Sequence, residues 1–154
     1  MTDCGAEVRL TTWAAGRSRL AAVRRAVFIE EQCIPESLEW DDHDAVSVHA
    51  LAADAAGHPV GTARLLPDGR IGRMAVIAAW RGRGVGRALL EAMVREARRR
   101  GHLGCRLDAQ VTAIGFYERA GFVAHGPVFD DAGIPHRAMT LRFDTGSQAA
   151  APTS

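Results

Sequence analysis

Residues 81–86 read Arg-Gly-Arg-Gly-Val-Gly and connect an apolar stretch, residues 74–80, to a long amphipathic segment, residues 84–100. After Val85, apolar residues recur three, four, seven and eight positions later, which predicts a helix with one side facing a core. The stretch before the glycines is predicted as a strand over 70–78. This unit of strand, glycine-rich turn and helix is the strongest structural signal in the chain.

The glycine-rich turn indicates an anion site. Three glycines in five positions let the backbone bend tightly and approach a ligand closely. The free N–H groups at the start of the following helix then converge on one spot, which suits a phosphate group. Arg81, Arg83 and Arg87 add positive charge there. A glycine-rich turn with surface arginines is, by itself, equally well explained as a plain connection between a strand and a helix.

The rest of the chain extends this unit in both directions. Upstream we predict a strand over 6–13, a helix over 15–32, a loop over 34–44 and strands over 45–54 and 59–66. Downstream we predict a strand over 103–109, a helix over 112–120 and strands over 122–126 and 136–143. The order indicates one α/β domain, residues 1–143, with a mixed central sheet and helices on both faces. Residues 144–154 are small and polar, and we expect a mobile tail.

Composition restricts the function further. The chain has 154 residues, which fits one domain, and its net charge of +1 is too small for a general nucleic-acid or membrane-surface binder. The first residues do not resemble a signal peptide, and no apolar run reaches the ~20 residues of a membrane span. Three cysteines without a C-x-x-C pair predict no metal site. We therefore expect a cytoplasmic protein without nucleic-acid, membrane or metal partners.

Two kinds of phosphate ligand fit the turn poorly. A nucleoside-triphosphate loop requires a lysine, and this chain contains none. A dinucleotide site requires G-x-G-x-x-G, whereas the glycines here stand at 82, 84 and 86. Asp108 lies about 20 residues beyond the turn, where a ribose-binding acid stands in dinucleotide folds. An NAD-binding oxidoreductase therefore remains an alternative.

Several stretches together resemble the GNAT acetyltransferases. The turn is similar to the Q/R-x-x-G-x-G/A loop of that family, and residues 115–122 (GFYERAGF) resemble its F-Y-x-x-x-G-F signature. Residues 27–32 (VFIEEQ), 109–110 (AQ) and 133–136 (GIPH) with Met139 are similar to the ElaA-type branch. The resemblance covers roughly residues 6–143 and rests on the combination of these motifs.

The resemblance implies an enzyme that transfers an acetyl group from acetyl-CoA to a small-molecule or peptide amine. Tyr117, at the position of the family's general acid, would protonate the leaving thiolate. Backbone N–H groups near Val76 would polarise the thioester carbonyl. The residues implied in acetyl-CoA binding are Met74, Ala75, Val76, Arg81, Gly82, Arg83, Gly84, Val85, Gly86, Arg87 and Gln110.

The chain departs from the family at the position of the general base. Many members carry a glutamate near positions 70–72, where this chain has Arg-Ile-Gly. Glu31, His49, Asp108 and His136 are candidate replacements, with Glu31 and His136 preferred, and deprotonation through water is equally open. The missing base also leaves a non-catalytic acyl-CoA-binding module as an alternative.

Charge along the chain is strongly segregated. Residues 30–44 hold seven carboxylates and no arginine, whereas residues 81–106 hold eight arginines and two glutamates. In the family the first segment lines the acceptor side, so we expect an acidic surface there that attracts an amine carrying a second positive charge. A solvated charged loop explains the segment equally well. The sequence leaves monomer and homodimer both open.

Overall fold

The strands form two antiparallel sheets that meet along one short line. The computed structural model describes residues 4–143, so the tail expected over 144–154 lies outside the described residues. Within that range, one sheet has the order β1-β2-β3-β4 and the other the order β5-β7-β6. The strands are β1 (Glu7–Thr11), β2 (Val48–Ala53), β3 (Pro59–Leu65), β4 (Ile71–Val76), β5 (Gly104–Gln110), β6 (Val123–Asp131) and β7 (Ile134–Arg142).

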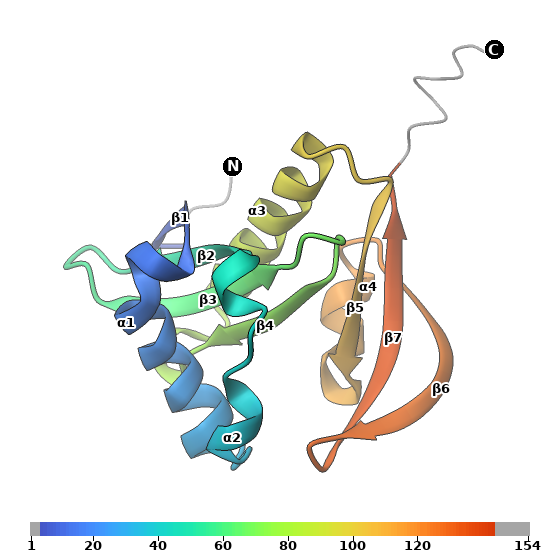
Figure 1. The fold of residues 1–154 in the computed structure, drawn as a ribbon, viewed down its shortest axis with the longest axis horizontal. Helices are drawn as coiled ribbons and strands as arrows, with labels where there is room; N and C mark the ends of the chain where they lie inside the picture. The colour runs from blue at the N-terminus through green and yellow to red at the C-terminus, as the bar shows by residue number, and fades with distance from the viewer. Residues whose placement is uncertain (1–3, 144–154) are drawn as a thin grey trace.

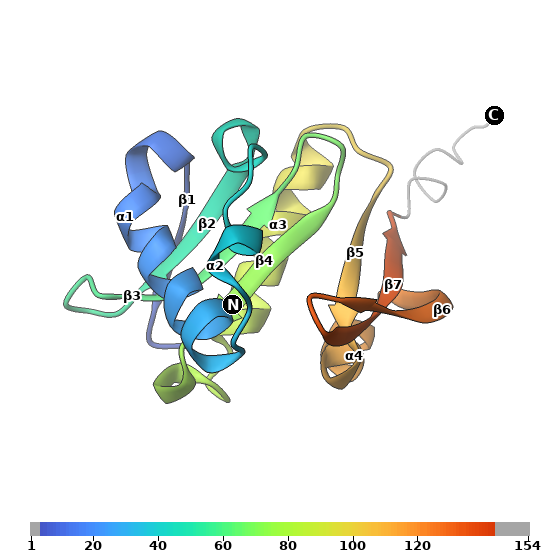
Figure 2. The ribbon, with the colours of Figure 1, turned by 60° about the horizontal axis from the view of Figure 1, so that its bottom comes forward.

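The two sheets touch near the starts of β4 and β5 and then separate. The backbone N–H of Arg106 donates to the carbonyl of Gly69 over 3.3 Å, and Arg70 forms a parallel bridge with Arg106. Beyond this junction β4 and β5 diverge (Figures 1 and 2). The expected mixed α/β architecture is confirmed, and the separation leaves one edge of β4 without a partner strand among the described residues.

A bulge in β4 redirects its backbone where the two sheets separate. Gly61 of β3 lies opposite Val76, whereas Arg64 lies opposite Gly72, so β4 carries one extra residue between these points. Arg73 lies in this stretch with a φ of +47°, a left-handed conformation that is uncommon for residues other than glycine. The bulge therefore re-aims the second half of β4.

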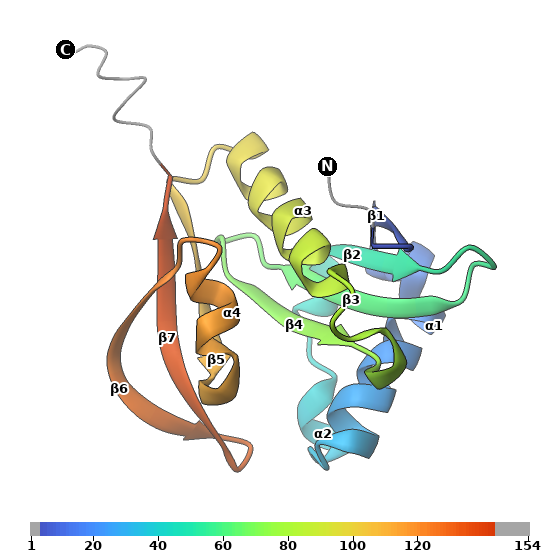
Figure 3. The same ribbon diagram turned by 180° about the vertical axis from the view of Figure 1, so that it is seen from behind.

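Helices cover both faces of the first sheet, as expected. α1 (Trp13–Arg24) and α2 (Glu36–Glu39) lie on one face and α3 (Val85–Arg99) lies on the other (Figures 1 and 3). The helix predicted over 15–32 changes type, because the chain continues beyond α1 as the π-helix η1 (Arg25–Glu31). π-Helical turns occur frequently at functional sites. No helix in the described part of the chain is long and apolar enough to cross a membrane.

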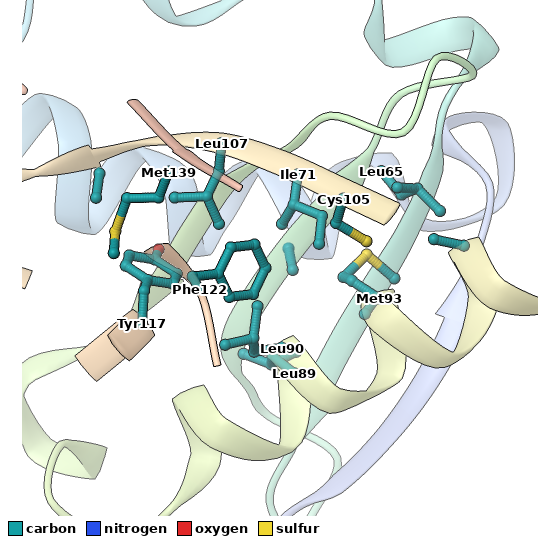
Figure 4. Packing of buried hydrophobic residues seen from close by; sticks show 14 of the residues in the cluster. Leu65, Ile71, Leu89, Leu90, Met93, Cys105, Leu107, Tyr117, Phe122 and Met139 are labelled. Atoms are coloured by element: carbon teal, nitrogen blue, oxygen red, sulfur yellow. The ribbon is translucent and has the colours of Figure 1, made fainter. Parts of the chain in front are cut away.

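α3 packs its apolar side into the core, as its periodicity predicts. Leu89, Leu90 and Met93 are at most 1% exposed. They belong to one buried cluster with Ile71 of β4 and Leu107 of β5, part of which Figure 4 shows from close by. Because this core includes residues of both sheets, it fixes the start of α3 beside the gap between β4 and β5.

The C-terminal part places a short helix and a long hairpin beside β5. α4 (Ile114–Glu118) begins after a 3₁₀ turn, so it is shorter than the helix predicted over 112–120. β6 extends well past the strand predicted over 122–126. The Gly-Pro pair at 126–127 does not end it, because β6 is an edge strand and its pairing with β7 shifts register there. The hairpin turns at Ala132 and Gly133, which both have positive φ.

Candidate active site

Two cavities lie beside the separated strands and meet. One, of about 900 Å³, is bounded by β4, α3 and α4, and we call it the turn cavity because residues 81–87 contribute to its wall. The other, of about 500 Å³, is bounded by β4, β5 and the β6–β7 hairpin, and we call it the hairpin cavity. Met74, Ala113 and Tyr117 line both. The two cavities therefore adjoin at these residues.

Most residues predicted to bind acetyl-CoA lie around the turn cavity. Those that line it are Met74, Ala75, Val76, Arg81, Gly82, Gly84, Val85, Gly86 and Arg87. Two of the predicted residues lie elsewhere. Arg83 stacks its guanidinium on the Trp80 ring at 4.7 Å. Gln110, at the end of β5, lines the hairpin cavity and donates to Gln32 Oε1 over 3.0 Å.

The glycine turn leaves the start of α3 open. Gly82 and Gly84 have φ of +77° and +90°, conformations that glycine adopts without strain. α3 begins at Val85 with no side chain capping its first turn, so its N–H groups are available to a ligand. A side chain at Gly86 would come within 3.4 Å of the Phe116 ring of α4. The turn therefore presents donors to the cavity, and Gly86 adds no side chain between α3 and the Phe116 ring.

Three further arginines line the turn cavity that sequence reasoning did not assign to it. They are Arg95, Arg98 and Arg119. Arg95 and Arg98 follow Arg87 by eight and eleven positions, so helical spacing could have placed them on the same side of α3. Glu91 lies four positions from both Arg87 and Arg95, and the structure pairs it with Arg87 at 3.2 Å. The turn cavity is thus more positively charged than expected.

The open edge of β4 carries a backbone donor between the cavities. The N–H of Ile77 donates to the carbonyl of Val60 in β3 over 3.0 Å. Because successive N–H groups of a strand point to opposite edges, the N–H of Val76 points away from β3. The Val76 carbonyl points the same way and accepts a hydrogen bond from Arg81 Nε over 2.9 Å. Val76 therefore offers its N–H at the edge that β5 leaves free.

Tyr117 stands where the two cavities meet. Its ring packs edge-on against Phe116 at 5.0 Å and Phe122 at 6.0 Å (Figure 4 shows its place beside Phe122 and Met139). Burial raises the pKa of its hydroxyl to about 12, so the phenol is protonated at neutral pH. Within residues 4–143 the hydroxyl has no hydrogen-bond partner. Tyr117 can therefore donate its proton to a group in the cavities.

His136 lines the hairpin cavity in a defined tautomer. Its Nδ1 lies 2.7 Å from the carbonyl oxygen of Ile134, which can only accept, so Nδ1 carries the proton. Nε2 of the neutral ring then keeps its lone pair, and it has no partner in the described part of the chain. Stacking on Phe129, with ring centroids 6.0 Å apart, holds the ring in place. These are the properties of a general base.

The other candidate bases are engaged elsewhere. Glu31 forms a two-point ion pair with Arg81, and the hydrogen bonds from Arg81 lower the pKa of its carboxyl group. His49 is fully buried and lines neither cavity. Asp108 lines the hairpin cavity but pairs with Arg70 at 3.1 Å. Nowhere in residues 4–143 do three His, Cys, Asp or Glu side chains gather as a metal site.

Arg24 of α1 organises the acidic segment from within. This guanidinium is completely buried, and its Nε lies 2.8 Å from Glu39 Oε2 and its Nη1 2.7 Å from Asp44 Oδ1. The rings of Trp13 and Trp40 lie 5.2 and 5.1 Å from it. Burial raises the pKa of Glu39, whereas at Asp44 burial is outweighed by hydrogen bonds from arginine, which lower the pKa. Both carboxylates are therefore buried partners of Arg24 and do not form part of an acidic surface.

Two more arginines connect this centre to the first sheet. Arg64 of β3 lies 2.8 Å from Asp41 and Arg73 of β4 lies 3.1 Å from the same carboxylate. Arg64 also contacts Asp44, and Arg73 also contacts Glu39. We call this group of six the arginine network: Arg24, Glu39, Asp41, Asp44, Arg64 and Arg73.

The acidic surface expected over residues 30–44 is therefore largely wrong. Three of its carboxylates belong to the neutral arginine network, and Glu36 pairs with Arg25 at 2.6 Å. Between residues 36 and 44, Asp42 is the one carboxylate without an ion pair among the described residues. The segment does contain an excess of carboxylates, but the arginines that pair with them come from α1, η1, β3 and β4. The linear sequence does not show that these elements lie beside the segment.

The fold and these motifs match known proteins. The family described as acetyltransferase (GNAT) domain matches residues 14–143. The chain is 36% identical over 121 residues to the uncharacterized N-acetyltransferase YjcF of Bacillus subtilis (strain 168), which covers 76% of this chain and 86% of that protein.

Solved structures give the same result. An acyl-CoA N-acyltransferase from Pseudomonas aeruginosa superposes with a TM-score of 0.79 and 30% identity, covering 88% of this chain and 99% of that one. ElaA of Escherichia coli superposes with a TM-score of 0.80 and 26% identity, covering 89% of this chain and 99% of that one. The resemblance inferred from the motifs is thereby confirmed.

Proposed function

The chain belongs to the acetyltransferase (GNAT) domain family, and we propose that it is an acetyl-CoA-dependent N-acetyltransferase acting on a small-molecule or peptide amine. The observation that carries this proposal is the meeting of the turn cavity and the hairpin cavity at Met74, Ala113 and Tyr117. A donor in the first and an acceptor in the second come together there. The family assignment leaves the nicotinamide alternative without support.

The residues of the turn cavity fit acetyl-CoA. The open N–H groups of α3, with Arg95, Arg98 and Arg119, suit the phosphates of the cosubstrate. Leu90 and Val94 give the same cavity an apolar side that suits the uncharged pantetheine arm. The volume of about 900 Å³ lies in the range of small-molecule and cofactor sites.

Three groups of this chain have roles in the transfer. Acetyl-CoA supplies an acyl thioester, whose C–S bond breaks as the acceptor nitrogen bonds to the carbonyl carbon. The N–H of Val76 stabilises the charge that develops on the carbonyl oxygen. His136 Nε2 takes the proton from the attacking nitrogen, and the Tyr117 hydroxyl protonates the departing sulfur. His136 and Tyr117 line the hairpin cavity from opposite elements, β7 and α4.

The hairpin cavity supports an acceptor with a second positive charge. Asp131, at the tip of the β6–β7 hairpin, lines this cavity, is exposed, and has no ion pair among the described residues. Its negative charge attracts a cation through the surrounding field. The reacting amine must be neutral to attack, so the attraction acts on the other charge. The proposed cationic preference thus moves from residues 30–44 to the hairpin.

Turnover with a panel of amines tests the proposed function. The purified protein is incubated with acetyl-CoA and each amine, and the release of free CoA is followed. We expect release that depends on the amine, with an acetylated product by mass spectrometry. A protein that binds acetyl-CoA by calorimetry but acetylates no amine is instead the acyl-CoA-binding module. A thermal shift with NAD and none with acetyl-CoA would contradict both.

A further inference from the structure

Glu31 and Arg81 connect elements that line different cavities. Arg81 lies at the glycine turn, and its Nη1 donates to Glu31 Oε2 over 2.6 Å while its Nη2 donates to Glu31 Oε1. The Nε of the same guanidinium donates to the Val76 carbonyl over 2.9 Å. One arginine therefore links the end of η1 to the end of β4, where the open backbone donor lies.

The other side of η1 belongs to the hairpin cavity. Phe28, in the middle of η1, and Gln32, directly after Glu31, both line that cavity. Gln32 exchanges hydrogen bonds with Gln110 of β5, at 3.0 and 3.5 Å between the side-chain amides. The next residue, Cys33, has a φ of +60°, so the chain leaves η1 through an unfavourable conformation that its surroundings must hold. Glu31, the last residue of η1, forms the ion pair that connects this helix to the glycine turn.

We propose that Glu31 is a positioning residue that acts through Arg81 to fix the η1 wall of the hairpin cavity against the glycine turn. The acceptor, held partly by Phe28 and Gln32, then lies in register with the backbone donor of Val76. This inference rests on the proposed function for its kinetic part. Both oxygens of Glu31 accept a hydrogen bond from Arg81, and these hydrogen bonds lower the pKa of the carboxyl group, which makes it a weaker base toward an amine.

Glu31→Gln tests the inference because the amide keeps the shape and removes the ion pair. For an exposed two-point pair we expect kcat/KM for the amine to fall about fivefold, mainly through KM. The affinity for CoA should change less than about twofold, and the pH profile of kcat should keep its shape. Hydrogen exchange on the protein alone should become faster over residues 25–34.

Glu36→Gln is the matched control. Glu36 pairs with Arg25, at the beginning of the same π-helix, over 2.6 Å and with similar exposure, but it lines neither cavity. This variant should leave the kinetics for the amine unchanged. In an Arg81→Gln background, Glu31→Gln should add no further loss in kcat/KM for the amine, because the two residues act as one unit.

Several results would overturn the inference. A loss of kcat by about 100-fold with a missing limb in the pH profile would make Glu31 the base. Additive losses in the double variant, or a loss confined to CoA affinity, would remove the coupling to the acceptor. Unchanged hydrogen exchange over residues 25–34 in Glu31→Gln would also contradict the inference, and this measurement needs no acetylated amine. Absence of turnover in the wild type, by contrast, contradicts the proposed function alone.

Discussion

His136 Nδ1 lies 2.7 Å from the carbonyl oxygen of Ile134, two residues earlier on β7. A carbonyl cannot donate, so this contact decides which ring nitrogen carries the proton. It assigns the lone pair to Nε2 of a residue that lines the hairpin cavity. Positions 70–72, where many family members carry a glutamate, hold Arg-Ile-Gly in this chain. We therefore propose that a base from the C-terminal hairpin replaces the one that the family places on β4.

His136→Gln keeps a polar side chain but cannot accept a proton at neutral pH. If His136 is the base, kcat should fall by ~10²–10⁴ while the affinity for acetyl-CoA stays the same. Steady-state kinetics and calorimetry measure the two quantities. A kcat within a few-fold of the wild type would assign the proton to a water relay instead.

Tyr117→Phe removes the hydroxyl and keeps the ring packed on Phe116 and Phe122. As the general acid, Tyr117 should contribute ~10²–10⁴ in kcat. Because burial raises its pKa to about 12, the phenol stays protonated below that pH, and the loss should be equal at about pH 7 and about pH 9. A loss that disappears at the higher pH, or no loss at all, would contradict the assignment.

Gly86→Val places a side chain against the Phe116 ring, on the wall of the turn cavity. The added methyl groups should lower acetyl-CoA affinity by about tenfold or more, because they occupy space next to the helix start. Calorimetry on the folded variant measures this, and the melting temperature shows whether the fold is retained. Gly72→Ala is the control and should bind normally, because a Cβ there meets no atom within 4 Å and the residue lies outside the turn cavity. Wild-type affinity in Gly86→Val would argue against phosphate binding at this turn.

Asp131→Asn removes the unpaired charge of the hairpin cavity. KM for a diamine should rise about two- to fivefold at low salt, and the effect should shrink as salt screens the field. KM for a monoamine with an uncharged tail should not change. Asp42→Asn serves as the comparison from the segment that the charge pattern favoured, and we expect it to have no effect. A larger effect from Asp42→Asn than from Asp131→Asn would instead assign the selection of the acceptor to the acidic segment, residues 30–44.

Arg24→Met should destabilise the fold strongly. It leaves Glu39 and Asp44 buried without their main partner, and breaking such a pair costs about 3–5 kcal/mol. Urea unfolding measures the change. Arg25→Met, which breaks an exposed pair one residue further along, should cost far less. Equal effects from the two variants would mean that the arginine network adds no stability of its own.

The sequence predicted the parts of this site that depend on local pattern. The turn at 81–86 and α3 follow from glycine spacing and 3.6-residue periodicity, and both are found where expected. The π-helix could not be foreseen, because its residues have the same apolar spacing as a continued α-helix. The bulge in β4 likewise leaves no mark in the sequence, since it places an arginine in a glycine-like conformation.

The pairing of charges depended on contacts between distant residues. Arg24, Arg64 and Arg73 lie 15 to 35 positions from the acceptor atoms they reach between residues 38 and 44. Composition showed an excess of carboxylates in this segment, but it could not show that α1 and two strands bring the matching cations. Counting charges along the segment therefore predicted an acidic surface, whereas in the fold Glu39 and Asp44 are buried and paired with arginine.

The arginine network also has a consequence for self-modification. All of its cations are guanidinium groups, and the whole chain contains no lysine. A guanidinium remains protonated at any working pH and has no lone pair with which to attack a thioester. A lysine in the same buried place would lose its proton more readily and become a nucleophilic amine. In this member of the acetyltransferase (GNAT) domain family, arginines of the network line the hairpin cavity, and acyl transfer to amines would leave their guanidinium groups unmodified.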